Sequence, residues 1–199
     1  DVGEKDLSSE AETWGFGEAE SIPLDVTPST YPDNESQADT AMAGIGQASV
    51  RVTPMQMAMV AETVANGGKQ MQPYLIDKVL DHDLSVVSTT TPTVARTPIS
   101  SDVASQLSSL MQDVVSDGTG TTAKVAGVQV AGKTGTAETG SDTGGPVTWF
   151  VGFAGTDISK PTIALAVVLD GGDQTSSTGT GGSVAGPIAA SVIDAAVDQ

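Results

Sequence analysis

A lysine flanked by glycines and threonines stands at the end of a short run of alternating apolar residues. The run from Val125 to Val130 leads into Gly132-Lys133-Thr134-Gly135-Thr136. Alternation of this kind predicts a β-strand, which would hold the ammonium group rigidly. The glycines would let a ligand approach the main chain, and the two hydroxyl groups can donate hydrogen bonds to an anion. The segment therefore predicts a site for a negatively charged group.

The same residues also match the pattern of a phosphate-binding loop. Gly127, Gly132, Lys133 and Thr134 have the spacing GxxxxGK[ST], and a later apolar run ends in Asp170, as a magnesium-binding strand would. Such a loop must open a helix whose N-terminus holds the phosphates. The residues that follow read GTAETGSDTGGP, and a segment this rich in glycine does not form a helix. The nucleotide-binding interpretation is therefore rejected.

Residue types that many catalytic and metal sites need are scarce in this chain. It has no cysteine and one histidine, His82, which stands between Asp81 and Asp83. We expect His82 to be a surface residue paired with these carboxylates. A cysteine nucleophile is excluded, and neither Ser-His-Asp catalysis nor a metal site is expected.

Lys133-Thr134-Gly135 is also the third motif of the penicillin-recognising serine acyltransferases. The chain resembles the C-terminal part of the transpeptidase domain of a class B penicillin-binding protein. Further short segments carry this resemblance in a fixed order: Gly44-Ile45-Gly46-Gln47, Thr53-Pro54-Met55-Gln56-Met57-Ala58, Ala65-Asn66-Gly67-Gly68, Gly118-Thr119-Gly120, Trp149-Phe150-Val151-Gly152-Phe153, Gly181-Gly182 and Ala185-Gly186-Pro187. Each segment alone is weak evidence for the family, but the order and spacing of all of them together are specific to it. The chemistry that the resemblance implies is that of a serine assisted by lysine.

The resemblance implies a role for each residue of the lysine motif. Lys133 is expected to be catalytic, by keeping the hydrogen bonds near the serine correctly protonated, and to attract the terminal carboxylate of the substrate. Thr134 and Thr136 are expected to bind that carboxylate, and the N–H of Thr136 to act in catalysis as an oxyanion donor. Gly135 is expected to leave room for a substrate strand. Glu138 and residues 139–145 would form a hairpin tip beside the cleft.

Two other motifs of the family do not occur in this sequence. No Ser-x-x-Lys is present, and Thr121-Thr122-Ala123-Lys124 is the nearest miss. Ser-x-Asn is absent too, because neither Asn34 nor Asn66 has a serine two residues before it. In family members both motifs precede the segment that resembles residues 1–16. We therefore expect residues 1–199 to be the C-terminal part of the domain, unable to form an acyl-enzyme without the N-terminal portion.

The reaction that the resemblance implies is peptidoglycan D,D-transpeptidation. The serine takes the acyl group of a D-Ala-D-Ala stem peptide, releases D-alanine and passes the acyl group to an amine of a neighbouring stem. The expected partners are peptidoglycan stem peptides, β-lactam antibiotics, the remaining N-terminal part of the same protein, and cell-division or elongation proteins. No cofactor or metal is required. The expected location is the extracytoplasmic face of the bacterial membrane, with an N-terminal anchor outside this sequence.

Two alternatives stay open from the sequence. A serine β-lactamase shares Lys-Thr-Gly, although the segments between Gly44 and Gly68 are more similar to the transpeptidases. A catalytically inactive penicillin-binding-like domain could instead serve as a scaffold in a division or elongation complex.

Composition sets limits that agree with these expectations. A chain of 199 residues with 38% hydrophobic content can bury one sizeable core, so one domain or most of one is expected. The net charge of −17 repels phosphate backbones, so no nucleic-acid binding is expected. No apolar run reaches the length that spans a membrane.

Hydrophobic periodicity predicts an α+β fold, with an antiparallel sheet covered by helices and a separate helical region. Helices are expected at Glu4–Trp14, after Thr53, after Ser100 or Ser101, and at Ser183–Val197. Strands are expected at Tyr74–Leu80, Val125–Ala137, Val147–Ala154 and Pro161–Asp170. A long loop is expected at Ser21–Met42. A polar stretch is expected at Asp81–Pro98.

Several packing details follow from the same patterns. Thr53 and Gln56 are expected to form a capping box at the start of their helix. The last strand would turn Ala164, Ala166 and Val168 to one face, where the final helix packs through Val184, Ile188, Val192 and Ala195. Trp149 and Phe150 are expected in the core.

Overall fold

The computed structural model describes residues 2–20, 22–33, 36–138, 145–171 and 179–197. The helices are α1 (Glu4–Thr13), α2 (Gln37–Ala43), α3 (Pro54–Ala65), α4 (Ser101–Ser116) and α5 (Gly186–Val197), with a 3-10 turn at Thr121–Ala123 and a π-helical turn at Gly181–Ala185. The strands are β1 (Gln70–Met71), β2 (Lys78–Leu80), β3 (Val86–Thr89), β4 (Val94–Arg96), β5 (Gln129–Ala137), β6 (Val147–Gly155) and β7 (Ile163–Leu169). In these residues no helix is long and apolar enough to cross a membrane.

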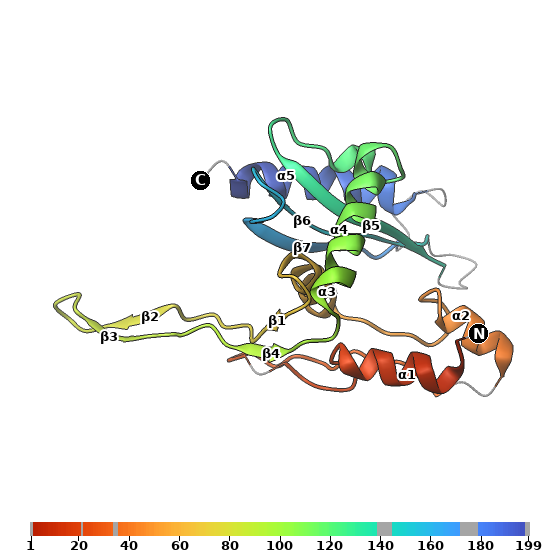
Figure 1. Cartoon of the computed structure of the whole chain (residues 1–199), viewed down its shortest axis with the longest axis horizontal. Helices are drawn as coiled ribbons and strands as arrows, with labels where there is room; N and C mark the ends of the chain where they lie inside the picture. The colour runs from red at the N-terminus through yellow and green to blue at the C-terminus, as the bar shows by residue number, and fades with distance from the viewer. Residues whose placement is uncertain (1, 21, 34–35, 139–144, 172–178, 198–199) are drawn as a thin grey trace.

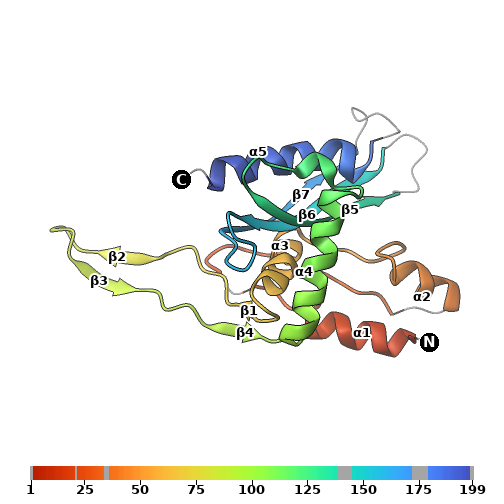
Figure 2. The same cartoon turned by 45° about the horizontal axis from the view of Figure 1, so that its top comes forward.

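A three-stranded antiparallel sheet in the order β5-β6-β7 forms the centre of the fold. Helix α5 covers one face and α3 the other, while α4 packs against β5 (Figures 1 and 2). This confirms the predicted α+β class. Strand β5 begins at Gln129, later than predicted, because residues 125–128 form a turn in which Gly127 has φ of +76°.

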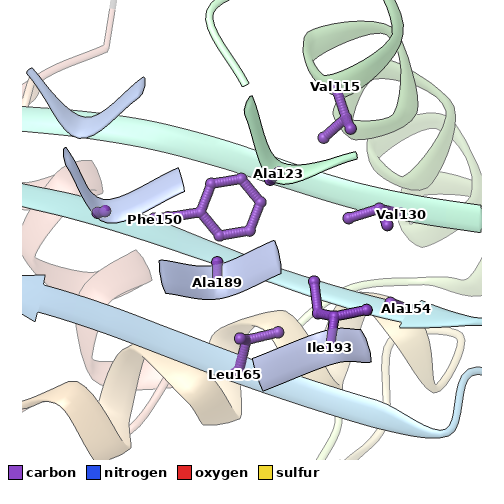
Figure 3. Packing of buried hydrophobic residues seen from close by; sticks show 9 residues of the cluster. Val115, Ala123, Val130, Phe150, Ala154, Leu165, Ala189 and Ile193 are labelled. Carbon is purple, nitrogen blue, oxygen red and sulfur yellow. The ribbon is translucent and has the colours of Figure 1, made fainter. Parts of the chain in front are cut away.

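The core between the sheet and α5 is built around Phe150. Its side chain is fully buried, and Figure 3 shows the ring between the strands and the segment of α5 that carries Ala189 and Ile193. The prediction that Phe150 is a core residue is confirmed. A Cβ atom at Gly132 would lie 2.2 Å from the phenyl ring, so the absence of a side chain on β5 makes room for Phe150.

The buried face of α5 differs from the predicted one. Ala185, Ala189 and Ile193 are completely buried, whereas Ile188 is 41% exposed and Val192 is 42% exposed. The predicted face is therefore wrong by one position. The small residues Ala185 and Ala189 on the buried face let the helix approach the sheet closely beside Phe150.

The alanine face of β7 is covered by a different helix from the one expected. Ala164 and Ala166 pack with Ala61 and Val64 of α3, while Leu165 lies on the side of α5. The alternation of β7 is as predicted, but α5 covers its larger residues. Alanines on both α3 and β7 allow these two elements to pack closely.

Helix α3 begins with a capped first turn that also attaches α1. The Oγ1 of Thr53 accepts a hydrogen bond from the N–H of Gln56 (3.1 Å), as predicted for an N-cap. The predicted return half of the capping box is wrong, because the side chain of Gln56 donates to the carbonyl of Trp14 (2.8 Å). Gln56 is buried and thus fixes the end of α1 on α3.

The segment predicted as a long loop, Ser21–Met42, contains most of a short helix. The side chain of Ser36 accepts a hydrogen bond from the N–H of Asp39 (3.1 Å) and caps α2. The rest of the segment that is described has bends at residues 22–24 and one bridge between Thr30 and Arg51. A helix of seven residues is too short for a clear apolar period, which explains the missed assignment.

A long arm projects from the body of the molecule between α3 and α4 (Figures 1 and 2). It is formed by β2 and β3, which pair in antiparallel fashion, with β1 and β4 at its base. The predicted strand Tyr74–Leu80 is reduced to β2, and the predicted polar stretch Asp81–Pro98 contains β3 and β4. His82 lies at the tip with its Nε2 3.2 Å from a carboxylate oxygen of Asp83, as predicted for a surface histidine.

Candidate functional site

The lysine motif lies on β5, one of the two edge strands of the described sheet. Its residues pair with β6 in an unbroken register, with Lys133 opposite Val151, Thr134 opposite Phe150 and Thr136 opposite Thr148. Strand alternation places Lys133 on the α3 face of the sheet and both threonine side chains on the α5 face. Because β5 is an edge strand, groups on both faces border the same open side.

Both threonine hydroxyl groups of the motif are held by neighbours on the α5 side. The Oγ1 atoms of Thr134 and Thr119 are 2.6 Å apart, and Thr119 lies in the turn after α4. The Oγ1 of Thr136 accepts a hydrogen bond from the N–H of Gly181 (3.2 Å) at the start of the turn that leads into α5. A side chain at Gly181 would meet the carbonyl oxygens of Trp149 and Gly135 at 2.3 and 2.4 Å, so only glycine fits there.

The main chain of β5 presents acceptors and a donor to its open side. The carbonyl of Thr134 accepts from the Nζ of Lys133 (2.7 Å), and the carbonyl of Thr136 accepts from the Nε2 of Gln47 (3.4 Å). Both carbonyls therefore point away from β6. In an antiparallel ladder the N–H and C=O groups of one residue point the same way, so the N–H of Thr136 also faces outward.

A cleft of about 1040 Å³ lies along this edge. Its lining includes residues 133–138 and, from the loop that carries Gln47, residues 45–48 and 50–52. A further, apolar part of the lining comes from three sources, namely Trp14, the α3 residues Met57, Val60, Ala61 and Val64, and the α4 residues Leu107, Leu110, Met111 and Val114. The lysine is thus the cationic group on β5 beside a largely apolar hollow.

Trp149 borders this cleft, although the sequence predicts it for the core. It is half-buried, packs with the α3 side of the sheet and contributes to the cleft wall. Its Cβ atom lies 3.3 Å from the position that a Cβ of Gly135 would take. Gly135 therefore has a packing partner inside the protein, in addition to the predicted role of leaving space for a ligand.

The structure brings Lys133, Thr134, Gly135 and Thr136 together on one cleft wall. Glu138, at the end of that wall, is exposed, and Gly145, at the other end of the predicted hairpin tip, is buried, while residues 139–144 of that tip lie outside the described residues. Three neighbours were not assigned to the site from the sequence: Thr119, Gly181 and Gln47. All three stand in segments that carried the family resemblance, which is the signal that could have indicated them.

Comparison with known proteins identifies the family. The model of the penicillin binding protein transpeptidase domain matches residues 1–194. The chain belongs to this family. It is 42% identical over 181 residues to the peptidoglycan D,D-transpeptidase PbpA of Mycolicibacterium smegmatis, covering 89% of this chain and 36% of that protein. The chain therefore spans about a third of the length of this curated relative.

Solved structures of transpeptidases show the same fold. Penicillin-binding protein A of Mycobacterium tuberculosis, as its ceftriaxone acyl-enzyme, matches with a TM-score of 0.86 and 37% identity over 96% of this chain and 43% of that one. The penicillin G acyl-enzyme of the same protein matches with a TM-score of 0.84 and 36% identity over 98% of this chain and 43% of that one. The predicted resemblance to penicillin-binding proteins is thus confirmed.

Proposed function

We propose that this chain supplies the lysine-motif wall of a peptidoglycan D,D-transpeptidase. The observation that carries the proposal is the edge of β5, where Lys133, two restrained threonine hydroxyl groups and the outward N–H of Thr136 face one cleft. A cation, hydroxyl donors and a main-chain donor are the groups that a substrate carboxylate and a developing oxyanion require. The acyl-enzymes that penicillin-binding protein A of Mycobacterium tuberculosis forms with ceftriaxone and penicillin G support the same chemistry.

In the proposed mechanism the residues of β5 bind and polarise, and the covalent step occurs on a serine elsewhere in the protein. Lys133 attracts the terminal carboxylate and helps to keep the network around the serine correctly protonated. The hydroxyl groups of Thr134 and Thr136 donate to the carboxylate. The N–H of Thr136 stabilises the tetrahedral oxyanion, and a donor in such a position contributes about 3 kcal/mol to lowering the barrier.

We further propose that an N-terminal portion of the same protein completes the domain. Strand β7 is an edge of the described sheet, and its sequence IALAVVL contains no charge or proline that would protect an exposed edge. The apolar walls of the cleft likewise leave Leu110 61% exposed and Ile45 74% exposed. Additional strands and a serine-bearing segment would cover both surfaces, with the Ser-x-x-Lys and Ser-x-Asn motifs that this chain lacks.

The substrates and location are part of this proposal. The donor is a D-Ala-D-Ala stem peptide, the acceptor is an amine of a neighbouring stem, and β-lactams acylate the same serine. Such a substrate lies outside the cytoplasm, so we place the domain on the extracytoplasmic face of the membrane, with its anchor in the N-terminal portion. Division or elongation proteins are proposed as partners in the intact enzyme.

The test uses the intact polypeptide that contains this chain. Incubation with a D-Ala-D-Ala stem peptide and an amine acceptor is expected to release D-alanine and form the cross-linked product, and fluorescent penicillin is expected to leave a stable label. Rapid hydrolysis of penicillin with no cross-linking would favour a β-lactamase. Absence of label and of D-alanine release would contradict enzymatic function and favour a scaffold.

A further inference from the structure

A loop opposite β5 is positioned to reach the active edge. Residues 44–50, called the Gln47 loop here, follow α2 and are held by hydrogen bonds from the N–H groups of Gly46 to Ala43 and of Gln47 to Met42, both 2.9 Å. The guanidinium of Arg51 donates to the carbonyls of Ala48 (3.2 Å) and Val50 (2.9 Å). These bonds restrain the loop on both sides of Gln47.

The side chain of Gln47 joins its loop to the main chain of β5. Its Nε2 donates to the carbonyl oxygen of Thr136 at 3.4 Å, between residues that are 89 positions apart in sequence. Gln47 is half-buried, and both residues line the same cleft. The distance exceeds the usual 2.9–3.0 Å of an N–H···O bond, so this contact is weak enough for a ligand to replace.

The acceptor that Gln47 occupies is one that an extended ligand would use. A peptide that lies along an edge strand binds through main-chain hydrogen bonds, with its N–H groups donating to outward carbonyls. On the part of β5 that carries the lysine motif, the carbonyl of Thr136 is such a group, next to the outward N–H of the same residue. A ligand N–H and the Gln47 carboxamide therefore require the same oxygen.

We propose that Gln47 is a specificity-determining residue that occupies the substrate acceptor of β5 in the free protein and is displaced by ligands carrying an amide N–H. This inference rests on the proposed acyltransferase function. The Gln47 carboxamide imitates the amide of a peptide strand, so the edge is satisfied while the cleft is empty. A ligand with an N–H replaces this bond by its own, whereas a ligand without one leaves Gln47 in place.

A comparison of two β-lactams tests whether the amide N–H of the ligand displaces Gln47. Penicillin G carries an acylamino N–H beside its reactive carbonyl, and imipenem carries a hydroxyethyl group at that position instead. In the intact polypeptide, Gln47→Ala is expected to raise the rate of acylation by penicillin G about two- to tenfold, the range of one net hydrogen bond. Acylation by imipenem is expected to stay unchanged. The ratio of the two rates is the readout, because a merely structural defect would alter both rates together.

Matched variants complete the experiment. Gln47→Met removes the donor at nearly constant size without adding a charge that would repel the penicillin carboxylate, and is expected to raise the penicillin G rate in the same way as Gln47→Ala. Ser49→Ala, at an exposed residue of the same loop, is expected to change neither rate. A slower reaction of Gln47→Ala with penicillin G, or an equal change with both compounds, would overturn the role of Gln47 while leaving the acyltransferase intact. Failure of the unaltered protein to react with either compound would overturn the proposed function itself.

Discussion

At the scale of single residues, the position of β5 at the edge of the sheet lets side chains from both of its faces border the same cleft. Alternation turns the ammonium of Lys133 and the hydroxyl groups of Thr134 and Thr136 to opposite faces. In a central strand these groups would lie in two different layers. At the edge they border one cleft, and contacts with Thr119 and Gly181 hold the hydroxyl groups in place.

Removal of the Lys133 ammonium tests the proposed role of the motif. In the intact polypeptide, Lys133→Ala is expected to slow acylation by penicillin about a hundredfold or more. The variant loses both the attraction of the ammonium group for the penicillin carboxylate and its help in keeping the network around the serine correctly protonated. Lys124→Ala, at an exposed lysine in the turn before β5, provides the matched charge control and is expected to react normally. Stopped-flow or gel-based measurement of the acylation rate gives the result. An unchanged rate for Lys133→Ala would remove this residue from the mechanism.

At the scale of elements, close packing decides which face of α5 is buried. The apolar residues Ile188 and Val192 lie at the surface, about two-fifths exposed, while small residues and Ile193 contact Phe150 and Leu165 (Figure 3). The π-helical turn Gly181–Ala185 leads into α5. The buried residues Ala185, Ala189 and Ile193 recur every four residues through this turn and α5, one position after the predicted Val184, Ile188 and Val192. A four-residue spacing therefore fits both faces, and choosing the larger apolar residues selects the wrong one.

This assignment of faces is tested by a pair of substitutions on adjacent residues. Ala189→Leu is expected to destabilise the protein by about 1–3 kcal/mol, because the added atoms have no space beside Phe150. Ile188→Ser is expected to change stability by only about 0.5 kcal/mol, since this side chain lies at the surface. Urea unfolding of both variants makes the comparison. The reverse order of the two effects would support the face predicted from the sequence.

At the scale of the whole molecule, the sequence predicts what depends on neighbours along the chain and misses much of what depends on tertiary contacts. The N-cap at Thr53 and the strand through Lys133 follow from local patterns, and both are present. The contact of Gln47 with Thr136 joins residues 89 positions apart, and no periodicity encodes it. The side chain of Gln56 was expected to close a local capping box, yet the main chain of Trp14 provides the better partner once α1 packs on α3.

Burial of a single carboxyl group makes the stability of the whole molecule depend on pH. Burial raises the pKa of the Glu62 carboxyl group on α3 above 4.5, and hydrogen bonds from the N–H of Met71 and from Asn66 oppose this shift. A raised folded pKa means that the folded state holds the proton more tightly than the unfolded state. The resulting stabilisation is complete below the unfolded pKa and is lost as the pH rises through the folded pKa.

Glu62→Gln removes this dependence. The amide oxygen can still accept the hydrogen bond from Met71, but it carries no charge to be desolvated. The variant is therefore expected to gain stability relative to the unaltered protein as the pH rises from below the ordinary pKa of 4.5 through the raised folded pKa of Glu62, as measured by urea unfolding. Glu12→Gln removes the same charge from an exposed position of α1 and controls for the net charge of −17. An equal gain in both variants would attribute the effect to net charge and not to burial of Glu62.

A crystal structure of the intact polypeptide acylated by penicillin G would test the proposed role of β5 most directly. The predicted result is an ester to a serine outside residues 1–199, with the penicillin carboxylate bound by the hydroxyl groups of Thr134 and Thr136. The acyl oxygen is expected to accept a hydrogen bond from the N–H of Thr136. An adduct whose carboxylate and acyl oxygen both lie away from β5 would contradict the assignment of the lysine motif as the wall that binds substrate.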